Sequence, residues 1–245
     1  MRLSDRDVRT ICHLWFWKMA TTSTLATLYY NSITDLSCYS RLWRLEKAGF
    51  IRAVCSSNGK EFVWILNSSG FEVFKGRCWA QFRDSGYKSE CIGHDLWASA
   101  IHQGEWIYGV PQSCDVFTEQ QLRRYSLESY PEWVPKTDMH RPDGYWLVND
   151  GTAERVVALE VELNQKSLDT YRTYGDNYSI DISCSDVIWV LGSNCNPDSI
   201  HKALISRLNG KSSPHSTLLL EDFLKEGWLA KFIGGKHEGI SMRNI

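Results

Sequence analysis

The chain has 245 residues, 43% of them hydrophobic and 23% charged, which is the composition of a globular protein and excludes disordered and fibrous classes. No run approaches the roughly 18 apolar residues that span a bilayer, and the first residues lack the apolar core of a signal peptide. The eight cysteines include no C-x-x-C pair. We therefore expect a cytoplasmic protein with reduced thiols and no membrane partner.

The net charge of −2 is unevenly distributed along the chain. Residues 1–76 hold ten Lys/Arg and six Asp/Glu, a charge of +4, whereas the remainder holds 17 and 23, a charge of −6. A basic region followed by an acidic one is typical of nucleic-acid docking by the first and metal-binding carboxylates in the second. Chance variation in surface charge is the alternative.

The first 76 residues predict three helices followed by a β-hairpin. Ser4 can cap a helix whose apolar residues recur at helical spacing up to Met19. A short helix is expected at about 24–30, and a third begins at Thr34-Asp35 and ends at Gly49. Two strand-like runs then flank a strong turn signal: Phe50–Cys55, Ser56-Ser57-Asn58-Gly59 and Glu61–Leu66.

This order describes a winged helix, and the segment from Arg41 to Ile51 resembles the end of the recognition helix and the first wing strand of that family. The third helix would then enter the major groove of double-stranded DNA, and the hairpin tip would reach a phosphate. The residues expected to contact DNA are Ser37, Ser40, Arg41 and Arg44 on the helix and Asn58 and Lys60 at the tip. Alternatively, the two arginines are solvated and the module binds protein.

Residues 77–90 are polar with weak periodicity, so we predict a winged-helix domain at 1–76, a linker at 77–90 and a second domain at 91–245. The second domain shows the order α-β-β-β-α-β, then α and β, which predicts a mixed sheet with helices on both sides, an α/β fold. Its expected elements lie near 92–103, 106–118, 144–163 (a hairpin), 165–178, 187–191, 198–209 and 217–220.

The hairpin carries the most informative side chains. Strand alternation places Val157, Leu159, Val161 and Leu163 on one face and both Glu160 and Glu162 on the other. A two-residue turn would put Asp143 opposite Ala158, and a longer loop would put it opposite Glu160. Either register brings three carboxylates to one face, a ligand set suited to Mg²⁺ or Mn²⁺. Solvated acids on a surface hairpin are the alternative.

A cationic residue follows Glu160 and Glu162 in the chain. Lys166, in the first turn of the next predicted helix, is expected to reach the same face and to hold a scissile phosphate or the attacking water. His94 and His140 are possible groups at the edge of the site, although a lone histidine is more often structural. Glu119 is either a further acid or a surface salt-bridge partner.

Asp143, Glu160-x-Glu162 and Lys166 on this element order resemble the PD-(D/E)xK nuclease superfamily over about residues 91–220. Pro142-Asp143 corresponds to its "PD". Position 162 holds Glu where Lys is usual, and Lys166 stands where some members carry the lysine on the neighbouring helix. The whole layout also resembles the replication-relaxation group of plasmid and mobile-element proteins, through His94-Asp95-Leu96, the Pro-Asp-Gly hairpin and Leu168-Asp169-Thr170-Tyr171.

The resemblance implies a metal-dependent endonuclease of a mobile element or plasmid that hydrolyses DNA phosphodiesters. Asp143 and Glu160 would ligate the metal, Glu162 would ligate it or orient water, and Lys166 would stabilise the phosphorane charge. The alternative is a catalytically inactive DNA-binding regulator of transcription, replication or mobilisation. In that case the second domain mediates dimerisation, giving a possible homodimer, or binds a partner.

Overall fold

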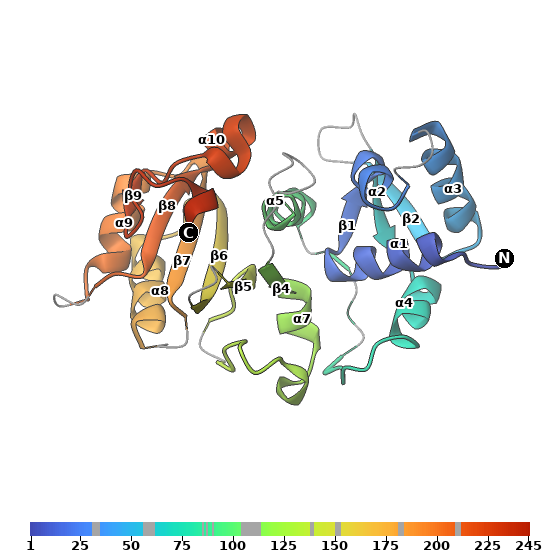
Figure 1. The fold of residues 1–245 in the computed structure, drawn as a ribbon, viewed down its shortest axis with the longest axis horizontal. Coiled ribbons are helices and arrows are strands. Elements are labelled where there is room, and N and C mark those ends of the chain that lie inside the picture. Colours follow the sequence, from blue (N-terminus) through green and yellow to red (C-terminus); the bar gives the residue numbers. More distant parts are fainter. Residues whose placement is uncertain are drawn as a thin grey trace. The chain divides into compact units, whose positions relative to one another are not determined.

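The computed structural model divides the chain into two compact units (Figure 1). The first comprises Met1–Ile101 and Arg123–Ser129, and the second comprises His102–Leu122 and Tyr130–Ile245. The structure describes residues 1–30, 35–55, 62–84, 86, 88–89, 91–103, 114–137, 140–149, 153–180, 184–208 and 212–245. Four predicted features lie outside the described residues: Thr34 at the start of the third helix, the hairpin tip with Asn58 and Lys60, the turn at 150–151 and the strand start at 106–113.

The first unit combines helices with an antiparallel sheet of order β1-β3-β2, as far as its strands are described. The central strand, β3, pairs with both neighbours, so that Trp64 lies opposite Ala20 and also opposite Ala53. The elements in chain order are α1 (Asp5–Phe16), β1 (Met19–Thr21), α2 (Thr22–Tyr29), α3 (Asp35–Lys47), β2 (Ile51–Cys55), β3 (Phe62–Leu66), α4 (Ser68–Lys75) and α5 (Ile92–His102, whose last residue belongs to the second unit).

Local side-chain chemistry explains where these helices start and stop. Ser4 and Asp7 form a capping box at the start of α1, which satisfies backbone N–H groups that have no partner within the helix. After α1 ends at Phe16, Lys18 adopts a φ angle of +63°, which a right-handed helix does not allow, and the chain enters β1. Thr21 caps α2 by accepting a hydrogen bond from the Thr24 amide at 3.1 Å. Met19, predicted to continue the first helix, therefore lies in a strand.

Aromatic packing joins distant segments of the first unit. The fully buried Trp15 ring stacks between Phe74 of α4, with centroids 4.2 Å apart, and Tyr125, at 5.2 Å. Such offset ring pairs add to the stabilisation that comes from burying the ring area. Tyr125 thereby ties the segment Arg123–Ser129 to the N-terminal helices.

The start of α5 also packs in the first unit, although the predicted boundary had assigned residues from 91 onward to the second domain. Ile92 and Leu96 contact the buried cluster of Met19, Val63 and Ile65. In addition, the Lys18 ammonium lies 2.8 Å from the Asp95 carboxylate, and both side chains are at least nine-tenths buried. Burial by itself would raise the pKa of Asp95, but His94, Lys18 and Ser89 outweigh it and lower that pKa to about 2.

Within the described residues, the second unit is built on a mixed sheet of order β4-β5-β6-β7-β8-β9. The strands β4, β5 and β6 are antiparallel neighbours, β6, β7 and β8 are parallel, and β9 is antiparallel to β8. The elements are β4 (Cys114–Thr118), α7 (Glu119–Arg124, whose last two residues belong to the first unit), η1 (Leu127–Ser129, of the first unit), β5 (Gly144–Asn149), β6 (Glu154–Asn164), α8 (Leu168–Ile180), β7 (Asp186–Asn194), α9 (Pro197–Ile205), β8 (His215–Leu219), α10 (Leu220–Glu226), η2 (Gly227–Leu229), β9 (Gly234–Gly235) and η3 (Met242–Asn244).

The parallel part of this sheet is formed by two crossovers, β6-α8-β7 and β7-α9-β8. Both run in the same direction across the sheet, so the usual right-handed rule brings α8 and α9 to one face. The two helices pack closely at Gly175, where a Cβ would lie 2.1 Å from the Leu204 carbonyl oxygen. The run from Val187 to Leu191 is at most 1% exposed, as expected for a central parallel strand.

The predicted mixed α/β class is thus confirmed. The short helices α7 and α10 and the edge strand β9 were not anticipated. Among the described helices, none has the length and apolarity that crossing a bilayer requires.

Candidate nucleic-acid interface and carboxylate site

One face of α3 is polar and exposed. Ser37, Ser40, Arg44 and Lys47 are all exposed and recur at intervals of three and four residues, so they form a single stripe along the helix. The opposite side is anchored by Cys38, Leu42 and Leu45, each of which is 0% exposed. Three of the predicted DNA-contacting residues, Ser37, Ser40 and Arg44, therefore lie together on a surface that a ligand can reach.

Arg41, expected to contact DNA, lies elsewhere. Its Nε donates to Asp7 Oδ1 at 2.8 Å, and a second guanidinium nitrogen donates to Asp7 Oδ2. Asp7 is fully buried and also accepts from the Ser4 amide and hydroxyl, each at 2.7 Å. Burial alone would raise the pKa of Asp7, but the hydrogen bonds from Arg41 and Ser4 outweigh it and lower that pKa. Arg41 thus ties α3 to the start of α1.

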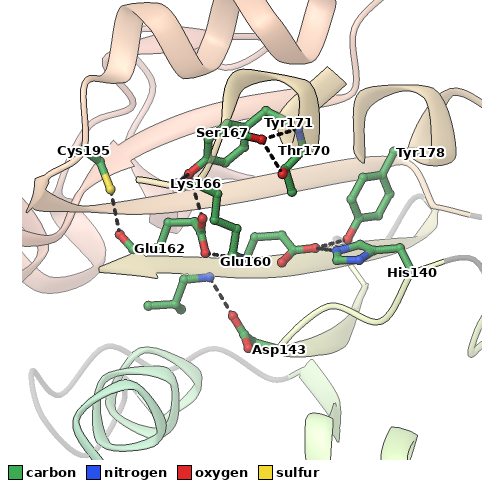
Figure 2. Close-up of polar contacts among 11 residues, drawn as sticks. His140, Asp143, Glu160, Glu162, Lys166, Ser167, Thr170, Tyr171, Tyr178 and Cys195 are labelled. Atoms are coloured by element: carbon green, nitrogen blue, oxygen red, sulfur yellow. Dashed lines mark hydrogen bonds and ion pairs between the residues drawn. The ribbon is translucent and has the colours of Figure 1, made fainter. Parts of the chain in front are cut away.

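In the second unit, β6 presents two buried carboxylates. Glu160 and Glu162 are each 6% exposed, and the intervening Val161 is 1% exposed on the opposite face. The predicted alternation is therefore correct, and both faces of the strand are covered. Figure 2 shows the two glutamate side chains on the same side of β6, directed toward residues of α8 and the segment before it.

Glu162 is bound by two donors. Lys166 Nζ lies 2.6 Å from Oε1, and the Tyr171 hydroxyl donates to Oε2 at 2.7 Å. Tyr171 is itself fixed, because its hydroxyl accepts a hydrogen bond from the Lys166 amide at 3.0 Å. Burial opposes the charge of Lys166, but its contact with Glu162 outweighs this and raises the pKa of Lys166. The predicted cation therefore reaches the site and forms an ion pair there.

Glu160 is bound by a second pair of donors. His140 Nε2 lies 2.5 Å from Oε1, and the Tyr178 hydroxyl also donates to that oxygen. The His140 ring stacks on Tyr174, with centroids 4.1 Å apart. Burial raises the pKa of Glu160; for His140 burial alone would lower the pKa, but the charge and hydrogen bond of Glu160 outweigh it and raise that pKa.

Asp143 occupies a different position. The pairing of Gly144 with Leu159 corresponds to the longer of the two predicted registers, the one that extends to Asp143 opposite Glu160. However, Asp143 precedes β5, and its Oδ2 accepts a hydrogen bond from the Val161 backbone amide at 2.7 Å. Figure 2 shows the Asp143 carboxylate directed at a backbone nitrogen of β6, that of Val161. The Asp143 carboxylate is therefore held by the backbone of β6, and the convergence of three carboxylates on a metal stays a prediction.

A buried histidine holds the backbone of Asp143. Trp146 Nε1 donates to His102 Nδ1 at 2.6 Å, so the ring proton of the neutral imidazole lies on Nε2, which donates to the Asp143 carbonyl oxygen at 3.1 Å. Burial lowers the pKa of His102 to about 4, which keeps the ring neutral near pH 7. The Glu119 amide donates to the same carbonyl at 3.1 Å. His102 was not identified from the sequence.

These residues do not fit a divalent metal as they lie. Both oxygens of Glu162 and one oxygen of Glu160 already accept hydrogen bonds from side chains of the chain. Among the described residues, no group of three or more His, Cys, Asp or Glu side chains is arranged to hold a metal ion. A metal would have to displace Lys166 and Tyr171, or His140 and Tyr178, and to bind Asp143 it would compete with the Val161 amide.

The sequence analysis named Tyr171 only as part of a family resemblance and assigned no site role to the tyrosines of α8. Tyr171, Tyr174 and Tyr178 recur at intervals of three and four residues and form one face of the helix over Glu160 and Glu162. That spacing is visible in the sequence and was the signal available. Of the two histidines considered at the edge of the site, His140 belongs to it, whereas His94 lies beside Asp95 in the first unit.

Comparison with known proteins gave no match to a protein-family model, to a curated protein or to a solved structure.

Proposed function

We propose that this protein binds double-stranded DNA through α3. The observation that carries the proposal is the element order α1-β1-α2-α3-β2-β3 with sheet order β1-β3-β2, the arrangement expected of a winged helix. In helix-turn-helix proteins, the second helix of the motif enters the major groove while other elements contact the backbone. Here α2 and α3 form that pair.

The exposed stripe of α3 has the chemistry that this role requires. Two hydroxyls, from Ser37 and Ser40, are followed by two cations, Arg44 and Lys47, in the last turn of the helix. Hydroxyl and cationic side chains are common donors to phosphate and to base edges. The clamp between Arg41 and Asp7 supports the same role, because it fixes the helix against α1 while leaving the stripe exposed.

A salt titration tests this proposal. Fluorescence anisotropy with a labelled duplex should show affinity that falls with salt, and replacing Arg44 and Lys47 by alanine should reduce the slope of log K against log salt by about 0.9 for each lost phosphate contact. The matched control removes two exposed cations of the second unit, Lys225 and Lys231. An equal loss in both variants would indicate a general charge effect, and no binding by wild type would refute the proposal.

For the second unit, we propose a nuclease-like frame that acts in binding rather than hydrolysis. The strands β4-β5-β6-β7, adjacent in the sheet and with the crossover helix α8 between β6 and β7, agree with the β-β-β-α-β part of the arrangement implied by the PD-(D/E)xK resemblance. The donors on Glu160 and Glu162 argue against a resident Mg²⁺ or Mn²⁺. The protein would then be a DNA-binding regulator of transcription, replication or mobilisation, a role that rests on the resemblance to the replication-relaxation group.

Metal-dependent hydrolysis is the second candidate, favoured by the same element order. Incubating supercoiled plasmid with wild type, Asp143→Ala and Lys225→Ala proteins in Mg²⁺ or Mn²⁺ separates the two. We expect no nicking and no shift of the melting temperature with Mn²⁺. Nicking that wild type and Lys225→Ala share, and that Asp143→Ala lacks, would establish hydrolysis instead.

A further inference from the structure

The first unit contains a cavity of about 490 Å³ beside the end of α4. Phe71 and Lys75 come from one face of α4, and Cys78, Ala80, Phe82 and Asp84 come from the segment that follows. Among the described residues, those that line the cavity include none from α3, so the cavity is separate from the proposed DNA-contacting stripe.

The lining of the cavity is apolar with a charged rim. Phe71 is 3% exposed, Ala80 is 7% exposed, and the rings of Phe71 and Phe82 meet edge to face at 5.9 Å. Lys75 and Asp84 contribute one positive and one negative charge, and Asp84 remains half exposed although it lies 2.9 Å from Arg124. A lining of this kind favours an aromatic group with polar surroundings.

Trp79 projects from the same segment into solvent. It lies between the lining residues Cys78 and Ala80, yet it is 81% exposed, the most exposed of the large hydrophobic side chains in the described residues. The backbone that presents it is fixed, because Gln81 exchanges hydrogen bonds with Ser126 and Ser129, both at 2.8 Å. The exposure of Trp79 is therefore a property of an ordered segment.

We propose that a second copy of this chain occupies the cavity, with Trp79 of each copy inserted into the cavity of the other. A twofold axis allows this exchange because the donor side chain and the acceptor cavity lie on one short segment, which makes the surface self-complementary. The same symmetry lets Lys75 face the partner's Asp84, so the charges at the rim are complementary as well.

The area that the two Trp79 side chains bury indicates how tightly the dimer should associate. Each of the two tryptophans buries roughly 150–250 Å², and together they bury much less area than a standard protein–protein interface. We therefore expect a reversible dimer with a dissociation constant on the order of micromolar. Since α3 takes no part, dimerisation and DNA binding can be measured separately, and failure of one does not imply failure of the other.

Analytical ultracentrifugation of the full chain without DNA, over roughly 1–300 μM, tests the proposal. Wild type should show a concentration-dependent monomer–dimer equilibrium, and Trp79→Ala should raise the dissociation constant by at least about 30-fold, the effect of removing an interface hot spot. Leu36→Ala is the matched control, because Leu36 is 74% exposed on α3, away from the cavity. Wild type that stays monomeric, or a dimer that Trp79→Ala leaves intact, would overturn it.

A mixing experiment tests the exchange itself. Ala80→Leu should obstruct the entry of a ring into the cavity while keeping Trp79, and Trp79→Ala keeps the cavity while removing the anchor. Circular dichroism melting first establishes that both variants are folded. If the exchange is reciprocal, the two variants mixed together should form a heterodimer tighter than either homodimer, because one insertion is restored. If the mixture associates no better than its components, the exchange is refuted.

Discussion

Replacing Arg41 by alanine separates the two roles that this residue could have in α3. The substitution removes two charge-assisted hydrogen bonds and leaves Asp7, which is 0% exposed, with only its contacts to Ser4. Removing one partner of a buried ion pair typically costs about 3–5 kcal/mol, and because the Arg41 side chain is 25% exposed we expect the lower end, about 3 kcal/mol. That is a large part of the stability of a typical domain.

Urea unfolding measures this loss, and a double-mutant cycle assigns it. Asp7→Asn keeps an oxygen that can accept from Ser4 but removes the charge that faces Arg41. If the pair acts as a unit, combining Arg41→Ala with Asp7→Asn should cost less than the sum of the single changes by about 0.5–3 kcal/mol. Arg9→Ala is the control, since Arg9 is exposed on α1 and should matter by no more than about 0.5 kcal/mol.

DNA binding by the same variants, at a temperature where each is folded, completes the test. Arg41→Ala should leave the salt slope unchanged, because Arg41 contacts Asp7 and not a phosphate. A slope reduced by about one unit, together with a loss of stability below about 1 kcal/mol, would show that Arg41 leaves Asp7 to contact DNA, and the assignment of the clamp would be wrong.

Three further outcomes are expected. Tyr178→Phe should cost about 1–3 kcal/mol in urea unfolding, because it removes a donor from the buried Glu160. Lys18→Met should lower stability at pH 7 by about 3–5 kcal/mol by leaving the Asp95 charge buried. The pKa of Asp95 is lowered to about 2 in the folded state, so the stability that the ionised Asp95 contributes is complete above the unfolded pKa of 3.8 and is lost as the pH falls toward 2. The difference in stability between wild type and Lys18→Met should therefore shrink between pH 4 and pH 2. Gly175→Ala should lower the melting temperature by several degrees, because the new Cβ would lie 2.1 Å from the Leu204 carbonyl oxygen. An unchanged melting temperature would contradict the packing of α8 on α9.

Much of the first unit could be predicted because its signals are local. Helix periodicity, the cap at Ser4 and the turn at Gly49, where φ is +81°, depend on residues close together in the chain. The strand β1 was missed because it has three residues and exists through pairing with β3, more than forty residues later. Nothing in the sequence marks Lys18 as a residue of positive φ, a conformation usually supplied by Gly or Asn.

The position of α5 could not be predicted for the same reason. Polarity and weak periodicity at 77–90 predict a linker, but they do not say which unit the next helix joins. That choice depends on long-range contacts, chiefly the buried Lys18–Asp95 pair and the packing of Ile92 and Leu96.

In the second unit, alternation correctly predicted that Glu160 and Glu162 share a face, because the rule holds within a strand. It could not be extended to Asp143, which lies before β5 begins. There the side-chain direction depends on the backbone contacts of Asp143 with Leu159, His102 and Glu119 and on its carboxylate bond to the Val161 amide.

The carboxylates of β6 show why paired acids on an apolar strand do not by themselves specify a metal. Buried charges require partners, and the sequence reasoning supplied a divalent cation for that purpose. The structure supplies the partners from the chain: Glu162 faces Lys166, Glu160 faces His140, and a tyrosine hydroxyl completes each pair. Tyr171 and Tyr178 are seven residues apart, two helical turns, so both hydroxyls come from one face of α8 and meet alternate residues of one strand. Since each glutamate already has both a basic partner and a hydroxyl donor, the requirement that pointed to a metal is met without one.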